Sequence, residues 1–304
     1  MSEKNAKVLL ASVILARSSS YVLQKIGLTN IDVFNLMGLS FLLAFIIMLL
    51  IFNKKLRYAD KSSVISGLIV GTIYFVVMSF EVFSLKTCES STTAFLENTA
   101  IVMVPLFEAL LLKKMPLPRT IIGFLMAITG VALMTLRGAS IYFSVGHILA
   151  IGAAATYAVA IIITDRVSKK ANALVIGIVQ LGTMGSLSVI SSFLFETPHL
   201  PSEPMSWFAI VLLALVCSCF GFTLQPVAQK YTSAETTGLY CAFGPLGAGV
   251  LGWICLGEAL SILALIGAVL ILLSIFLVHK GYKLLCGFDA ARFSILMSPF
   301  LSLA

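Results

Sequence analysis

Residues 96–114 read LENTAIVMVPLFEALLLKK, an apolar run that contains two glutamates and ends in two lysines. About 20 mostly apolar residues are what a membrane-spanning helix needs. The whole chain of 304 residues follows the same pattern, since 60% of its residues are hydrophobic and only 11% are charged. Ordinary soluble domains carry about 25% charged residues. The sequence therefore predicts an all-α integral membrane protein, in which Glu97 and Glu108 need a reason to be there.

The net charge of +7 does not indicate a nucleic-acid partner, because the basic residues fall in short clusters between apolar segments. The six cysteines show no C-x-x-C spacing and lie mostly in apolar segments, which favours buried free thiols. The first apolar stretch follows Lys4 and Lys7, as in a signal peptide, but it lacks a cleavage site and is long enough to span. We interpret it as the first transmembrane helix.

Hydropathy along the chain predicts ten membrane spans joined by short connections, which leaves little room for a soluble domain. The expected spans are 6–26, 33–52, 63–84, 91–112, 117–136, 144–165, 171–194, 206–228, 236–256 and 260–280.

The basic residues predict the orientation of these spans, because cytoplasmic loops are enriched in lysine and arginine. With the N-terminus inside, 16 of the 20 basic residues lie on the cytoplasmic side, three lie outside, and Arg17 lies within the first span. We expect a multi-pass protein of the plasma membrane, such as a bacterial inner membrane, with both termini in the cytoplasm. Residue 60 and the tail then face inward, and residue 200 faces outward.

The two halves of the chain repeat each other. A shift of 144 residues aligns Lys86 with Lys230, Leu112 with Leu256 and Gly123 with Gly267. Near the start, a shift of 136 aligns Ser20-Tyr21 with Thr156-Tyr157. Because each half has an odd number of spans, the second half enters the membrane inverted, as in many secondary transporters. The predicted units are a first five-helix repeat (1–140), a second (141–282) and a cytoplasmic tail (283–304).

Several short motifs in the second half carry a family resemblance. They are Tyr231-Thr232-Ser233-Ala234, Gly244-Pro245 and Leu256-Gly257-Glu258, followed by the span that contains Gly267. This order of motifs and the two inverted halves resemble the EamA-type members of the drug/metabolite transporter superfamily. Lys113-Lys114 stands where the first half of that family has Gly-Glu. The resemblance implies a ten-helix transporter that exports or exchanges small metabolites, with amino acids, amines and drugs among the cargo.

The two glutamates of the opening stretch have different expected roles. They are 11 residues apart, about three helical turns, so they share one face of the fourth span. Glu108 is close to the lysines at the cytoplasmic end, so we expect it to pair or to reach the interface. Glu97, beside Asn98, lies deeper, and a charge there costs roughly 2.5–3.5 kcal/mol unless it faces a cavity or a partner. We expect Glu97 to face a cavity and to couple transport to protons.

Glu81 and Gln225 occupy equivalent positions under the 144-residue shift, which suggests that both line one central cavity. The alternative for Glu81 is an ion pair with Lys86 at the outer interface. Arg17 is the only cation near the middle of a span, and its expected partner is one of the carboxylates, since an unpaired buried charge is costly. That pair could be a structural salt bridge or part of a substrate site.

Further polar residues are expected at the same cavity, on spans 1, 3, 4, 6, 8 and 9. Span one contributes Ser20, Tyr21 and Gln24 after two further serines, a run that favours a wet helix face. Tyr74, Tyr157 and Tyr240 are candidate cavity aromatics, with a role in the apolar core as the alternative.

Motifs of common enzymes are missing from the sequence, which has no H-E-x-x-H, no phosphate-binding glycine loop and no G-x-S-x-G. The three histidines are scattered near span ends, so we expect no metal, no cofactor and no enzymatic activity. The sequence predicts a secondary transporter that moves a small polar or amphipathic metabolite by alternating access, in the export direction. Its alternatives are an exchanger or facilitator without proton coupling, or a membrane assembly or sensor protein. The cargo and the oligomeric state stay open.

Overall fold

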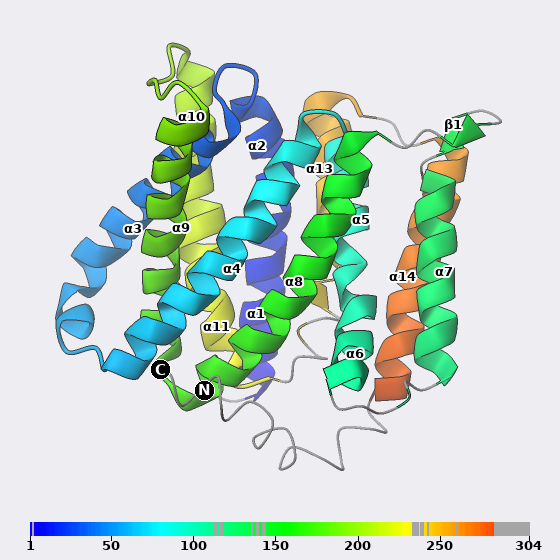
Figure 1. Cartoon of the computed structure of the whole chain (residues 1–304), viewed down its shortest axis with the longest axis horizontal. Coiled ribbons are helices and arrows are strands. Elements are labelled where there is room, and N and C mark those ends of the chain that lie inside the picture. The colour runs from blue at the N-terminus through cyan, green and yellow to red at the C-terminus, as the bar shows by residue number, and fades with distance from the viewer. Residues whose placement is uncertain are drawn as a thin grey trace.

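The computed structural model is almost entirely helical (Figure 1). It describes residues 1, 3–111, 115, 118–134, 136–137, 140–141, 144–232, 237, 240–241, 243–258 and 261–282. A short antiparallel pair joins β1 (Leu136–Arg137) to β2 (Ser140–Ile141), with Leu136 opposite Ile141. The expectations for the Glu108 side chain, for Lys113-Lys114 and for the tail lie outside the described residues.

The long helical segments cross the molecule back and forth, with α2 continuing α1 and α6 continuing α5, so that their ends gather at two opposite sides (Figure 1). They are α1 (Glu3–Ser18), α2 (Ser20–Gly27), α3 (Val33–Arg57), α4 (Lys61–Leu85), α5 (Ser90–Asn98), α6 (Ala100–Leu111), α7 (Pro118–Met134), α8 (Val145–Lys170), α9 (Ala173–Phe195), α10 (Pro204–Leu212), the π-helix η1 (Leu213–Phe222), α11 (Thr223–Gln229), α13 (Phe243–Leu256) and α14 (Ile262–Tyr282).

Several of these segments are long and apolar enough to cross a membrane, which confirms the prediction of a helical membrane protein. Six are full-length candidates: Lys4–Gly27, Val33–Arg57, Lys61–Leu85, Val145–Lys170, Ala173–Phe195 and Pro204–Gln229. Thr120–Met134, Phe243–Leu256 and Ile262–Leu277 are shorter apolar helices. Each of the ten segments predicted from hydropathy contains helix in the structure.

In the part of the chain that the structure describes, three of the predicted spans depart locally from a regular α-helix. Span one breaks at Ser19, whose hydroxyl donates to the carbonyl oxygen of Ala16 at 2.7 Å. Span four breaks at Thr99, whose hydroxyl donates to the carbonyl of Leu96 at 2.7 Å. Serine and threonine hydroxyls that bond the preceding turn compete with helical hydrogen bonds, although the backbone of Ser19 and Thr99 stays in the α-helical region.

Span eight contains the third interruption, the π-helix η1, which leads into α11. Pro226 lies inside α11 and has no N–H to donate to the preceding turn. A wider π-turn just before such a proline lets the chain continue as one helical segment. Irregular backbone at membrane depth is tolerated where protein buries it, and it often marks a binding site.

The helices pack in a reciprocal pattern. Helix α3 packs on α9, and α7 packs on α14 at one edge of the molecule (Figure 1). Helix α4 contacts α8 and α9, and η1 in the same way contacts α1 and α3. Close approach depends on glycine: a methyl group at Gly71 of α4 would lie 2.9 Å from the carbonyl oxygen of Gln180 on α9. Small residues of this kind let membrane helices approach closely.

Candidate functional site

Arg17, near the end of α1, is the centre of a polar cluster between the interrupted helices. Its Nη1 donates to Gln225 Oε1 of α11 at 2.5 Å and to the Tyr157 hydroxyl of α8 at 3.3 Å. Its guanidinium lies 4.2 Å from the centre of the Phe222 ring, a cation–π contact with η1. Arg17 therefore binds neutral hydrogen-bond acceptors and an aromatic face.

The expected ion pair of Arg17 is not formed: within the described part of the chain, Arg17 makes no salt bridge to Glu81 or Glu97. The two carboxylates nevertheless lie near enough to act on the guanidinium electrostatically. Arg17 needs no direct ion pair, because an amide oxygen, a phenol and a ring face together satisfy its planar guanidinium.

Aromatic side chains surround this cation. Gln225 Nε2 donates to the Tyr74 hydroxyl of α4 at 3.3 Å. The Tyr74 ring packs edge-on against Tyr157 at 6.0 Å and against Phe222 at 5.5 Å between ring centres. Tyr74 and Tyr157 also belong to the main hydrophobic core. The cavity and core roles considered for these tyrosines are thus combined, with the ring in the core and the hydroxyl at the polar cluster.

Glu81 of α4 and Glu97 of α5 lie beside each other, one 1% and the other 0% exposed. The two carboxyl groups are near enough to interact electrostatically, and Oε1 of each is buried without a hydrogen-bond partner among the described residues. The Tyr21 hydroxyl donates to Glu97 Oε2 at 2.9 Å. The alternative of a Glu81–Lys86 ion pair was wrong, because Lys86 lies 3.4 Å from Asp32 instead.

The remaining residues expected at the site are placed less uniformly. Asn98 donates to the carbonyl oxygen of Ala94 on its own helix at 2.8 Å. Ser20 and Gln24 line a small pocket between α2, α3, α4 and η1, with room for about one water molecule. Tyr240 packs instead against a separate apolar cluster formed largely by α7, α14 and neighbouring helices. The structure therefore joins Arg17 to Gln225 and Tyr157, and Tyr21 to Glu97, whereas Asn98 and Tyr240 make other contacts.

Two contributors to the site were missed from the sequence. Phe222 lies under Arg17, and the Cys241 thiol lies 3.5 Å from the Tyr157 hydroxyl. Both are apolar or weakly polar residues inside apolar runs, so no local pattern distinguishes them from core residues. Helix α3 was also not expected, yet Ser40 and Phe41 line the small pocket. The irregular helix η1 places Phe222 at the site, and Pro226 just after it is the one feature in the sequence that marks this segment.

The comparison with protein families covers almost all of the chain. The model of the EamA-like transporter family matches twice, over residues 6–136 and again over residues 144–279. This chain belongs to the EamA-like transporter family. The family is part of the drug/metabolite transporter superfamily, so the resemblance found in the sequence motifs is confirmed. The family match and the relatives support a membrane transporter.

Individual relatives give the same result. An uncharacterized transporter of Archaeoglobus fulgidus is 25% identical over 279 residues, which is 89% of this chain and 96% of the relative. The uncharacterized transporter YetK of Bacillus subtilis is 24% identical over 286 residues, 90% of this chain and 86% of the relative. One solved crystal structure has a TM-score of 0.68 to this chain at 18% sequence identity. The match covers 93% of this chain and 99% of that chain. That likeness shows a shared fold.

Proposed function

We propose that this EamA-family chain is a secondary transporter with ten membrane spans in two inverted five-helix repeats, 1–140 and 141–282. The two separate family matches and the reciprocal packing of the helices support the repeats. The cargo is a small polar or amphipathic metabolite, and it moves outward across the plasma membrane by alternating access of a central site. The N-terminus and the tail lie in the cytoplasm.

The observation that carries the coupling mechanism is the burial of two neighbouring carboxyl groups, Glu81 and Glu97, near Arg17. In a dry site two ionised carboxylates repel each other strongly, so the pair holds a proton between them. Arg17 lies on the other side of the same cluster and supplies a fixed positive charge. A proton arriving from one side and cargo arriving from the other then compete for one polar site. Alternating access converts this competition into exchange of a proton for cargo.

Two hydrogen bonds between separate helices orient the charged groups of this mechanism. Tyr21 on α2 orients Glu97 on α5, and Gln225 on α11 orients Arg17 on α1. Each of these contacts crosses between separate helices, so a rocking motion of one repeat against the other would change them. A site at the interface of repeats is where many secondary transporters bind substrate.

The test begins with the cargo. A thermal-shift screen of the purified protein with amino acids, amines, nucleosides and organic phosphates identifies a compound for flux measurements. Proteoliposomes with an acidic interior should then accumulate that compound. Glu97→Gln keeps the shape of the side chain and removes its charge change. We expect it to retain exchange of cargo for cargo and to lose accumulation driven by the pH gradient.

Asn98→Ser, at the residue next to Glu97, serves as the matched control. Asn98 bonds only its own helix among the contacts described, and its replacement should leave the pH-driven accumulation largely intact. A Glu97→Gln protein that still concentrates cargo in acidic vesicles would contradict proton coupling. The protein would then be an exchanger or facilitator.

A further inference from the structure

A second polar network lies away from the Arg17 cluster, at the end of the molecule where α2 ends and α5 begins (Figure 1). Its centre is Glu258, which follows Gly257 at the end of α13. Gly257 has a left-handed backbone with φ of 66°, and its N–H donates to the carbonyl oxygen of Trp253 at 3.2 Å. This glycine cap ends α13 and turns Glu258 back toward α5.

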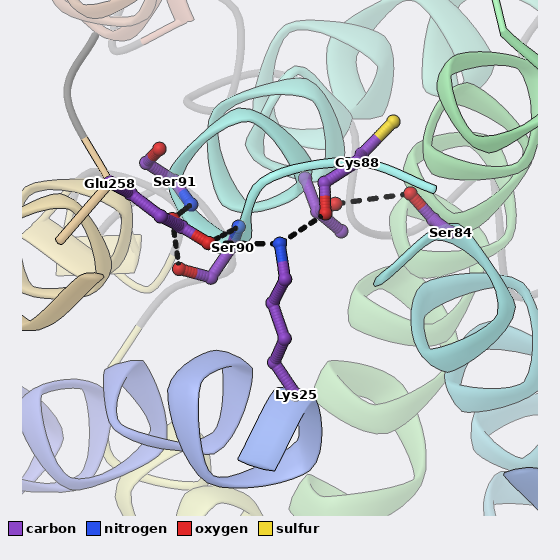
Figure 2. A network of polar contacts seen from close by, with 7 residues as sticks. Lys25, Ser84, Cys88, Ser90, Ser91 and Glu258 are labelled. Atoms are coloured by element: carbon purple, nitrogen blue, oxygen red, sulfur yellow. Dashed lines mark hydrogen bonds and ion pairs between the residues drawn. The ribbon is translucent and has the colours of Figure 1, made fainter. Parts of the chain in front are cut away.

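Glu258 caps the start of α5 with both of its carboxylate oxygens (Figure 2). Oε1 accepts the Ser90 N–H at 3.0 Å, and Oε2 accepts the Ser90 hydroxyl at 2.6 Å and the Ser91 N–H at 3.3 Å. A carboxylate at a helix N-terminus satisfies free N–H groups and interacts favourably with the helix dipole. Gly252 makes room for this contact, since a methyl group there would lie 2.7 Å from the Ser90 hydroxyl.

Lys25 of α2 completes the network from the opposite side (Figure 2). Its Nζ lies 2.9 Å from Glu258 Oε1 and donates to the carbonyl oxygen of Cys88 at 2.7 Å. The Glu258 side chain is only 8% exposed and that of Lys25 is 30% exposed. Burial by itself raises the pKa of Glu258, but the hydrogen bonds from Ser90 and the contact with Lys25 outweigh it and lower the pKa. The carboxylate is therefore stabilised in its charged form.

Helices α2 and α5 also carry the hydrogen bond between Tyr21 and Glu97 in the candidate site. Lys25 and Tyr21 are about one turn apart on α2, and Ser90 and Glu97 are about two turns apart on α5. The Tyr21–Glu97 hydrogen bond and the Lys25–Glu258–Ser90 network thus join α2 to α5 at two levels. If α5 moves away from α2 at this end of the molecule, both sets of contacts must change.

We infer that Lys25 and Glu258 form a latch that holds α2, α5 and α13 together and keeps the candidate site closed at this end. Release of the latch opens the path to Glu97 from the side opposite the N-terminus. The role of the latch in transport rests on the proposed function. Closure of this end does not, because it can be measured on the protein without cargo. Glu258 is a positioning residue, since it acts on the site through α5.

Cys88 reports opening of the latch. Its carbonyl oxygen accepts from Lys25, and its side chain is buried. The reporter protein keeps Cys88 and replaces the other five cysteines, Cys217, Cys219, Cys241, Cys255 and Cys286, by serine or alanine. It is placed in nanodiscs, where a membrane-impermeant maleimide reaches both faces. The rate of Cys88 labelling is then measured without any cargo.

Lys25→Met and Glu258→Gln should each increase the labelling rate by about tenfold, because charge-assisted hydrogen bonds are roughly twice as strong as neutral ones. The double variant should label no more than modestly faster than either single variant, since both changes break one interaction. Lys25→Arg keeps the charge and should label slowly. Lys86→Met is the matched control, because Lys86 forms the more exposed pair with Asp32 near the same end.

Labelling at the wild-type rate in Lys25→Met and Glu258→Gln would overturn the latch, as would an equal increase in Lys86→Met. Gel filtration checks that each variant is folded, and Lys25→Met alone decides the matter if Glu258→Gln does not fold. The outcome is separate from the proposed function. A latch that opens in these variants of a protein with no detectable transport would leave the latch standing and contradict the transport proposal.

Discussion

Arg17 shows, at the scale of a residue, how a charge can be kept inside a membrane protein without a direct ion pair. Its guanidinium has Gln225 and Tyr157 as acceptors and the Phe222 ring beneath it. Hydrogen bonds to charged groups contribute about 1.5–3 kcal/mol each. The carboxylates of Glu81 and Glu97 add attraction from farther away without using up the guanidinium N–H groups.

We therefore expect Arg17→Met to lower the melting temperature of the detergent-purified protein by several degrees, equivalent to about 2 kcal/mol. Gln225→Met should have at least as large an effect, because it leaves the buried guanidinium without its closest acceptor, whereas Arg17→Met leaves only an amide unpaired. The double variant should be less destabilised than the sum of the single variants, since both remove the same hydrogen bond. Differential scanning fluorimetry measures all three, and additive effects would show that Arg17 and Gln225 act independently.

The residues of the site could be predicted in part from the cost of burying charge. Glu81, Glu97 and Arg17 are conspicuous in an apolar sequence, and the repeat shift pointed to Gln225 as the partner position of Glu81. Their actual contacts could not be predicted, because Arg17 and Gln225 are 208 residues apart and meet only through the packing of α1 against η1 and α11. Tyr240 was misplaced for the same reason, since a tyrosine near a span carries no local sign of which face is wet.

At the scale of elements, close packing of α4 against α9 depends on glycines rather than on apolar area. A methyl group at Gly71 would lie 2.6 Å from Thr183 Cβ and 2.9 Å from the carbonyl oxygen of Gln180. At Gly152 of α8 the nearest atom would be Phe80 Cδ2 at 3.6 Å, which is ordinary contact. The two glycines are thus a matched pair in helices of the same core.

Gly71→Ala should destabilise the protein by about 1–3 kcal/mol through overpacking, and Gly152→Ala should be neutral or slightly stabilising. The expected result is a lower melting temperature for Gly71→Ala alone. Equal melting temperatures for the two variants would mean that α4 and α9 can move apart at no cost, contrary to the packing described.

Hydropathy predicted where the helices lie, but it did not predict where they break. The interruptions at Ser19 and Thr99 coincide with hydroxyl groups that bond the preceding turn, and η1 lies just before the helix that contains Pro226. Such breaks change few residues and leave the mean hydropathy of the span unaltered. They matter because Arg17, Glu97 and Gln225 all lie within a few residues of a break.

At the scale of the whole molecule, the distribution of charge indicates how the protein sits in the bilayer. The N-terminus, the α3–α4 and α8–α9 connections and the end of α11 gather at one end of the molecule (Figure 1). These segments contain ten basic residues with described side chains: Lys4, Lys7, Lys54, Lys55, Arg57, Lys61, Arg166, Lys169, Lys170 and Lys230. Lys25 and Lys86 lie at the opposite end. The fold adds to the count made from the sequence, since it brings residues from four separate stretches of the chain to one face.

Cytoplasmic surfaces of membrane proteins are enriched in lysine and arginine, so the face with the N-terminus should be cytoplasmic. Tyr58, between α3 and α4, is 85% exposed on that face, and Leu200, between α9 and α10, is 66% exposed on the other. In a background without native cysteines, Leu200→Cys should react with an impermeant maleimide in intact cells. Tyr58→Cys should react only after the membrane is permeabilised, with both thiols labelled equally in detergent as the control. Labelling of Tyr58→Cys but not Leu200→Cys in intact cells would reverse the orientation, and the latch would then close the cytoplasmic side of the site.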